Sequence, residues 1–383
     1  MQENILIWNV LNRAMIDSNA GNGNDQKIAI ANACSHGGVH SVNPNLVKID
    51  FSSNVNPLGI SKKVIHSLQK NAGLISSTYP DTECKDLRKK LCDYLGKDLD
   101  PEWITVGNGA TEIIHNFART FVRNKVVIPA PTFCEYELAS KRMGANILFA
   151  PLKDLTLDTK DIIEKAKNSD AVFLCNPNNP TGLLSTKSIK KIIERIDSST
   201  KILIDECFIE LVDDDNAQYA IIDKIKEFDN LVILRSLTKS FGLAGLRVGY
   251  SICNPRLTRQ LSANKIPWNV NGMAQIAGIV ALQDLMHVRK AKEIIKKERR
   301  CMHGDIKRKT NSFIPCKSDV NYFLIHLKEN SVRIRDSILI KSGILVRDCS
   351  TFTGMEKAEY IRVAVKTHKE NLLLIEALES IDR

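Results

Sequence analysis

Short, continuously apolar runs alternate with longer amphipathic segments through the middle of the chain, and this alternation limits the possible folds more than any other feature. Runs that are apolar at every position are typical of parallel strands covered on both faces, and the helix-period segments between them supply the cover. We therefore predict an α/β fold with a mostly parallel sheet between helices. The predicted strands are 125–129, 146–150, 171–175, 201–205, 231–235 and 248–253, and the predicted helices are 110–121, 134–143, 158–168, 186–196 and 216–227.

The pattern changes after Pro267, where a second, smaller region begins. Residues 271–310 have the spacing of one long helix, and residues 5–16 have that of a short amphipathic helix before a Gly- and Asn-rich linker. We predict an N-terminal arm at 1–35, a large domain at 36–267 whose N-terminal segment contributes to the small domain, and a small α+β domain at 268–383. In the small domain, strands are predicted near 320–326, 343–347 and 360–365, and a closing helix at about 368–381.

The 383 residues carry a formal net charge of +10, with 43% hydrophobic and 26% charged residues. This composition excludes a disordered or collagen-like chain, and the basic excess suits nucleic acid, an acidic lipid surface or small anionic ligands. The basic residues are dispersed and form no recognisable binding module, which disfavours nucleic acid. No apolar run approaches the roughly 20 residues that cross a bilayer, so no membrane partner is expected.

Residues Met1 to Trp8 include an acid and no basic segment, so they do not resemble a signal peptide. The ten cysteines include no C-x-x-C pair and no grouping with histidine, so no metal site is predicted. Without a secretory segment, the cysteines are expected to be reduced thiols. The predicted location is the cytoplasm.

Two loops that follow predicted strands carry features of ligand sites. In Gly107-Asn-Gly-Ala-Thr111, the glycines allow a tight turn that would direct the amides of Ala110 and Thr111 at an anion. Asn176-Pro-Asn-Asn-Pro-Thr-Gly182 forms a rigid loop at the carboxyl end of a buried strand, where open α/β sheets bind ligands.

An acid and a lysine follow the next strands. Asp205 ends the run 201–205, and it is a helix N-cap, a rim carboxylate or the partner of a protonated ring nitrogen, because an unpaired buried carboxylate would be costly. Lys239 lies in Ser236-Leu-Thr-Lys-Ser240, with an arginine downstream. This set suits an aldehyde cofactor that bears a phosphate, because a lysine can bond to the aldehyde. The phosphate would be held by Ser236, by Ser240 or Thr238, and by Arg247.

Taken in order, these four segments resemble the fold-type-I pyridoxal-phosphate enzymes of the aspartate aminotransferase superfamily, from about residue 36 onward. The resemblance implies a large domain with a mostly parallel seven-stranded sheet, a smaller α+β C-terminal domain, and pyridoxal 5'-phosphate as cofactor. Lys239 would hold the cofactor and Asp205 would keep its pyridine nitrogen protonated. The implied cofactor-binding residues are Gly109, Ala110, Thr111, Phe133, Asn179, Asp205, Phe208, Ser236, Thr238, Lys239 and Arg247.

In this family, Asn179 would bind the ring oxygen O3′ and Phe133 would stack on the ring. Tyr79 matches a tyrosine that reaches the cofactor phosphate of the neighbouring subunit, which implies a homodimer with shared sites. Phe208 departs from the pattern, because relatives acting on histidinol phosphate carry a tyrosine there whose phenol contacts O3′.

The flanking segments resemble the L-threonine-O-3-phosphate decarboxylases of cobalamin synthesis, which implies decarboxylation of threonine phosphate to aminopropanol phosphate. Decarboxylation of L-serine O-phosphate and transamination of histidinol phosphate stay open, since one methylene discriminates weakly and the motif residues are shared. A non-enzymatic role is disfavoured because the lysine and the strand acid are both present. The matching segments are His36-Gly-Gly-Val-His40, 49–59, Pro267-Trp-Asn-Val-Asn271, 346–354 and 360–366, and the implied substrate ligands are His36, Gly37, Asn56, Asn179, Arg347 and Arg362.

Overall fold

The computed structural model describes residues 36–213 and 218–382. A seven-stranded sheet has the order β2-β8-β7-β6-β5-β3-β4, in which β8 is antiparallel to both neighbours and the remaining pairs are parallel. The prediction of a mostly parallel sheet is therefore confirmed. The strands are β2 (Ile104–Gly107), β3 (Lys125–Ala130), β4 (Asn146–Pro151), β5 (Ala171–Cys175), β6 (Lys201–Asp205), β7 (Leu231–Ser236) and β8 (Gly249–Cys253).

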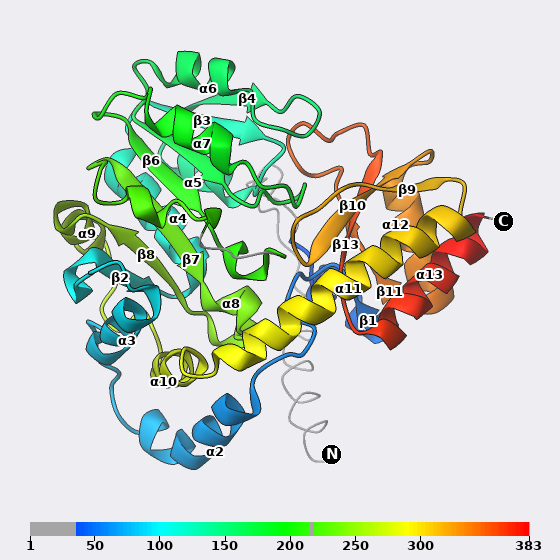
Figure 1. The fold of residues 1–383 in the computed structure, drawn as a ribbon, viewed down its shortest axis with the longest axis horizontal. Coiled ribbons are helices and arrows are strands. Elements are labelled where there is room, and N and C mark those ends of the chain that lie inside the picture. Colours follow the sequence, from blue (N-terminus) through cyan, green and yellow to red (C-terminus); the bar gives the residue numbers. More distant parts are fainter. Residues whose placement is uncertain (1–35, 214–217, 383) are drawn as a thin grey trace, which may run out of the picture. The chain divides into compact units, whose positions relative to one another are not determined.

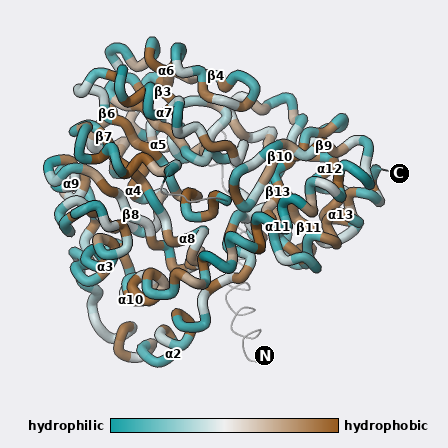
Figure 2. Tube along the Cα trace, in the orientation of Figure 1, coloured by the Kyte–Doolittle hydropathy of each residue, from teal (hydrophilic) through white to brown (hydrophobic). Residues whose placement is uncertain are grey.

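Helices lie on both sides of this sheet (Figure 1). Strands β5 and β6 are buried along nearly their whole length, as continuous apolar runs predict, and Figure 2 shows hydrophobic residues concentrated in β6 and β7. The helices of this part are α2 (Lys62–Ser76), α3 (Lys85–Leu95), α4 (Gly109–Phe121), α5 (Glu135–Arg142), α6 (Thr159–Ala166), α7 (Thr186–Ile193), α8 (Leu237–Ser240), α9 (Pro255–Ser262) and α10 (Gly272–Ala281).

The register of the parallel strands brings their carboxyl ends to one edge. Cys175 at the end of β5 pairs with Asp205 at the end of β6, and Asp205 pairs with Leu234 of β7. The loops after β5, β6 and β7 therefore begin side by side, and these loops carry the motifs singled out in the sequence.

Two helix predictions were wrong. The described part of 216–227 forms only a short 3₁₀ turn at Ile222–Lys224, because the backbone N–H of Ile221 donates to the buried Glu206 carboxylate (2.6 Å). The predicted helix 271–310 is two helices, α10 and α11 (Leu285–Lys309), with a break at Asp284. There the Asp284 carboxylate accepts a hydrogen bond from the Ser61 hydroxyl (2.5 Å), a contact with a distant part of the chain.

The C-terminal region contains a four-stranded antiparallel sheet in the order β12-β13-β10-β9. A separate parallel pair joins β1 (Ile49–Asp50) to β11 (Ile344–Leu345), so the beginning of the described chain pairs with a strand near its end. The other elements are β9 (Phe313–Pro315), β10 (Tyr322–Leu327), α12 (Ser331–Ser342), β12 (Arg347–Asp348), β13 (Tyr360–Ala364) and α13 (His368–Asp382).

The buried apolar side chains form two main clusters. One surrounds the seven-stranded sheet and includes Ala274 of α10 and Ile295 of α11, and the other includes Phe51, Met302 and the strands of the C-terminal sheet. The domain boundaries at 36–267 and 268–383 stay predictions, and the predicted arm at 1–35 lies outside the described residues. Within the described ranges, no helix is long and apolar enough to cross a membrane.

Candidate active site

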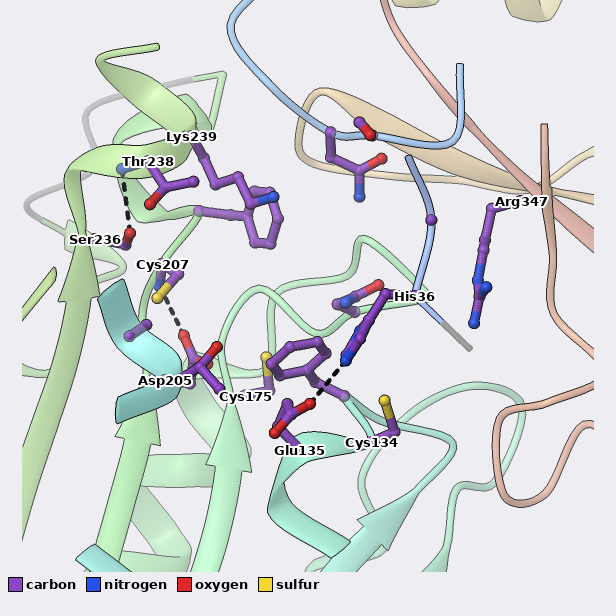
Figure 3. A pocket seen from close by; sticks show the side chains of 18 of the residues that line it. His36, Cys134, Glu135, Cys175, Asp205, Cys207, Ser236, Thr238, Lys239 and Arg347 are labelled. Atoms are coloured by element: carbon purple, nitrogen blue, oxygen red, sulfur yellow. Dashed lines mark hydrogen bonds and ion pairs between the residues drawn. The ribbon is translucent and has the colours of Figure 1, made fainter. Parts of the chain in front are cut away.

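A cavity of about 370 Å³ is lined by the loops that follow β5, β6 and β7 and by residues of the C-terminal sheet (Figure 3). It collects residues from almost the whole chain, from the first described residue to β13. Most of the predicted site residues line it: His36, Gly37, Ala110, Thr111, Phe133, Asn179, Asp205, Phe208, Ser236, Thr238, Lys239, Arg247, Arg347 and Arg362.

Four predicted residues do not line this cavity, and one of them is Ser240, the alternative to Thr238 as a phosphate ligand. Gly109 lies directly behind it with φ +79°, and a Cβ at this position would lie 2.5 Å from Nη2 of Arg247, so a glycine is required. Asn56 is buried, and its amide donates to the carbonyl of Ser240 (2.7 Å), which supports the loop after Lys239. The Tyr79 side chain is 84% exposed and packs against Trp268, with ring centroids 5.0 Å apart.

Asp205 is buried at the floor of the cavity and accepts two hydrogen bonds. The Tyr136 hydroxyl donates to Oδ2 (2.7 Å) and the Cys207 backbone N–H donates to Oδ1 (2.9 Å). Burial raises the pKa of Asp205, and these hydrogen bonds oppose the rise. A buried carboxylate in this position is suited to a cationic partner, such as a protonated pyridine nitrogen. Tyr136 was not predicted, although it lies only three residues after Phe133.

Lys239 lies in the short helix α8, which begins where the Ser236 hydroxyl accepts a hydrogen bond from the Thr238 N–H (3.1 Å). Its Nζ is 5.8 Å from the centroid of the Phe208 ring. Burial, and then the positive charge of Arg362, lower the pKa of Lys239 to about 8. A larger fraction of the amine is therefore neutral near pH 7 than in an ordinary lysine, and the neutral amine is the form that attacks an aldehyde.

The start of helix α4 forms another part of the cavity wall, and it lies very close to strand β8. A Cβ at Gly249 would lie only 2.6 Å from the backbone nitrogen of Ala110, so the strand and the helix terminus could not otherwise approach. The amides at a helix N-terminus favour an anion. With the hydroxyls of Ser236 and Thr238 and the Arg247 guanidinium at the same cavity, these amides fit the phosphate of pyridoxal 5'-phosphate.

Two buried arginines face the cavity from the C-terminal sheet. Arg347 of β12 and Arg362 of β13 are direct register partners. Arg362 donates to the side-chain oxygen of Asn179 and to the carbonyl of Ser52, and its Nε has no hydrogen-bond partner among the described residues. Burial, and then the charge of Arg362, lower the pKa of Arg347 to about 10. An anionic ligand between the two guanidinium groups would relieve their repulsion and desolvation.

A buried carboxylate that the motifs did not indicate joins two histidines at the cavity. Glu135 accepts from Nε2 of His36 (2.7 Å) through Oε1 and from Nε2 of His115 (2.8 Å) through Oε2. These hydrogen bonds, from His115 and then from His36, lower the pKa of Glu135 to about 2. No sequence signal could have found this cluster, because its members are 20 and 99 residues apart along the chain.

Over residues 36–213 and 218–382, no three His, Cys, Asp or Glu side chains are placed to hold a metal ion. Eight cysteines in these ranges are free thiols.

The family model for class I and II aminotransferases matches residues 47–378. A protein of Caldanaerobacter subterraneus subsp. tengcongensis, provisionally named threonine-phosphate decarboxylase, is 36% identical over 334 residues, which are 86% of this chain and 89% of that protein. The crystal structure of the histidinol-phosphate aminotransferase from Clostridium acetobutylicum is 32% identical with a TM-score of 0.80, over 87% of this chain and 99% of that one. The crystal structure of L-threonine-O-3-phosphate decarboxylase from Porphyromonas gingivalis is 26% identical with a TM-score of 0.74, over the same shares of the two chains.

Proposed function

The chain belongs to the class I and II aminotransferase family of pyridoxal-phosphate enzymes, and from this premise we propose that it decarboxylates L-threonine O-3-phosphate. The products are carbon dioxide and (R)-1-aminopropan-2-yl phosphate, which serves the nucleotide loop of cobalamin. The first-named relative above, at 36% identity, and the Porphyromonas gingivalis structure support this choice of activity.

The observation that carries the proposal is the pair of buried arginines, Arg347 and Arg362, in one cavity with Lys239. Threonine phosphate has a carboxylate and a phosphate on neighbouring carbons, so it brings two anionic groups to one small site. Histidinol phosphate has no carboxylate and carries an imidazole as well. A cavity of about 370 Å³ that must also hold the cofactor is near the lower end for ligand sites and favours the smaller substrate.

Each residue of the site then has a defined task. Asp205 would hold the pyridine nitrogen in its protonated form, and Arg362 would bind the substrate carboxylate. His36 and Arg347 hold the phosphate at the far end of the substrate. When bound, pyridoxal phosphate supplies an electron sink for the pair released from the bond that breaks.

With the cofactor bound, decarboxylation would require the substrate to be held so that its bond from Cα to the carboxylate, and not its bond from Cα to hydrogen, is the one that breaks. Anchoring of the phosphate by His36 and Arg347 uses binding energy at a remote group to set this orientation. Carbon dioxide would leave, and the protonated amine of Lys239 would donate a proton to Cα. An aminotransferase would instead present the hydrogen on Cα to the same lysine, so orientation alone separates the two reactions.

The experiment is a product analysis of the holoenzyme with threonine phosphate, serine phosphate, and histidinol phosphate plus 2-oxoglutarate. We expect carbon dioxide and aminopropanol phosphate in equal amounts from threonine phosphate. We expect a kcat/KM for serine phosphate that is about 10- to 200-fold lower, because one methyl group is worth no more than this.

Unphosphorylated threonine is the matched substrate control and should be a poor substrate. Glutamate formed from histidinol phosphate without release of carbon dioxide from either phosphoamino acid would contradict the proposal and establish an aminotransferase. A higher kcat/KM for serine phosphate than for threonine phosphate would identify the ethanolamine-phosphate reaction instead.

We further propose that the enzyme is a homodimer in which Tyr79 serves the phosphate site of the neighbouring subunit. Tyr79 does not line the cavity of its own chain, and its ring is exposed beside the half-exposed Trp268. Large exposed aromatic side chains that pack on each other are typical of subunit interfaces.

A hybrid-dimer experiment tests this arrangement. Tyr79→Ala should lower activity by about 10-fold or more, since one hydrogen bond to a charged phosphate is removed. Mixing this variant with an excess of the inactive Lys239→Ala variant should restore activity, because the hybrid has one site with both residues intact. Refolded mixtures that stay as inactive as Tyr79→Ala alone would show that Tyr79 acts within its own chain or not at all.

A further inference from the structure

One turn of chain, Phe133 to Tyr136, makes three separate contacts with the site. Phe133 lines the cavity, and Tyr136 holds Asp205. Between them, Glu135 begins helix α5 and is only 6% exposed, with each carboxylate oxygen bonded to a different imidazole. An ion this deeply buried with two such partners is held in one place.

The contact with His36 determines how that ring meets the cavity. The Glu135 carboxylate can only accept hydrogen bonds, so the Nε2 atoms of His36 and His115 both carry hydrogens. Because Nε2 of His36 is bonded to Glu135, Nδ1 is the ring nitrogen that is left to contact a ligand. Figure 3 shows the ring of His36 extended toward Glu135 along this contact, at the wall of the cavity that also contains Arg347.

The backbone next to His36 is also fixed. A Cβ at Gly37 would lie 2.8 Å from the Ser52 carbonyl, so the chain lies against Ser52 too closely for any side chain. The Gly38 N–H donates to the Ser52 hydroxyl (2.7 Å), and Arg362 donates to the Ser52 carbonyl (2.7 Å). The His36 segment is thus tied at its ring to Glu135 and at its backbone to the residue that also holds Arg362.

We propose that Glu135 is the positioning residue for phosphate recognition: it accepts from Nε2–H of His36 and so directs Nδ1–H of the same ring, in its doubly protonated form, to donate to a phosphate oxygen of the substrate. This inference rests on the proposed function for the identity of the substrate. His115, on α4 and largely buried, bonds the second oxygen of Glu135 and keeps the carboxylate from rotating. Glu135 also lines the cavity, but both of its carboxylate oxygens are occupied by imidazoles, so we assign it the orientation of His36 and not a contact with the substrate.

The test is a double-mutant cycle on the holoenzyme, read by spectroscopic titration of threonine phosphate and of threonine. His36→Ala and Glu135→Gln should each raise the Kd of threonine phosphate by about 10- to 100-fold, because a hydrogen bond to a charged group is lost or misplaced. Each should change the Kd of threonine by less than about twofold. The double variant should bind threonine phosphate no more weakly than His36→Ala alone, since both changes remove the same interaction.

Glu298→Gln is the matched control. Glu298 is a similarly buried carboxylate that accepts a hydrogen bond from a histidine, Nδ1 of His368 (3.0 Å), but it does not line the cavity. The Glu298→Gln variant should leave the ratio of the Kd of threonine phosphate to the Kd of threonine unchanged. If Glu135→Gln and His36→Ala raise the Kd independently, or if Glu135→Gln keeps the wild-type ratio, the inference is overturned.

A second measurement does not depend on a Glu135 variant folding. The nitrogen-15 resonance of His36 Nδ1, assigned by its loss in His36→Ala, should shift when threonine phosphate binds and stay in place when threonine binds. A shift of Nε2 alone would overturn the inference. If the wild type binds threonine phosphate without releasing carbon dioxide, only the decarboxylase proposal fails, because these readouts measure binding.

Discussion

Replacing Lys239 by alanine is expected to remove the covalent attachment of pyridoxal phosphate and to lower kcat for the proposed decarboxylation by about 10³-fold or more. The expectation follows from two separate tasks of one amine: it bonds the aldehyde in the resting enzyme and it returns a proton to Cα. Burial and Arg362 lower the pKa of this amine to about 8, so part of it is already neutral at pH 7. The measurements are the visible absorbance of the purified protein and the rate of carbon dioxide release.

The control for this variant is Lys187→Ala. Lys187 is an exposed residue of α7 outside the cavity, and its loss should change neither the absorbance nor the rate. Non-covalently bound cofactor can remain in Lys239→Ala, held by the helix α4 amides and Arg247. A variant that keeps the spectrum of covalently bound cofactor would refute the assignment of Lys239.

The largest expected effect on stability comes from Arg235→Met, which should lower the free energy of unfolding by about 3–5 kcal/mol. Arg235 lies on β7 and donates from Nε and Nη2 to one oxygen of Glu206 (3.0 and 2.8 Å). Its Nη1 is 3.9 Å from Glu210, and all three side chains are buried. Removal of the guanidinium would leave two buried carboxylates without their shared cation. Chemical denaturation followed by tryptophan fluorescence measures the change.

An exposed ion pair provides the comparison. Lys153 and Asp158 are 2.5 Å apart, but the lysine is largely exposed, so Lys153→Met should leave the denaturation midpoint unchanged within error. An Arg235→Met variant as stable as the wild type would mean that Glu206 and Glu210 take up protons at little cost. In that case the cluster would stabilise the fold through packing and not through charge.

The fold was predictable from sequence where hydrophobic burial alone decides structure. Strand 171–175 was predicted with its observed bounds, because a sheet covered on both faces leaves every position apolar. The helix predicted at 216–227 and the uninterrupted helix at 271–310 were wrong for a shared reason. Glu206 binds the backbone of Ile221, and Ser61 binds Asp284, across 15 and 223 residues of sequence. Local spacing contains no information about such partners.

The residues of the candidate site also fall into a group that was predictable from sequence and a group that was not. Lys239, Asp205 and Asn179 follow strands within recognisable motifs, and the parallel register brings those strand ends together, so their common cavity could be predicted. Tyr136 and Glu135 could not, because their roles depend on where α5 packs against the strands and against the His36 segment. These contacts join residues that are far apart in the sequence, so neither secondary-structure propensity nor motif spacing predicts them.

The parallel pairing of β1 with β11 has a consequence for synthesis of the protein. The residues that follow β1 reach their final place only when strands from the last tenth of the chain exist, since the Ala364 N–H donates to the Phe51 carbonyl (2.9 Å). Chains emerge from the ribosome with the N-terminal end first. The stretch from His36 to Ser53, which contributes its first two and last two residues to the cavity, therefore reaches its final place only when almost the entire protein has been translated. Because Arg362 of β13 belongs to the same cavity, we expect a chain that ends before β13 to be inactive.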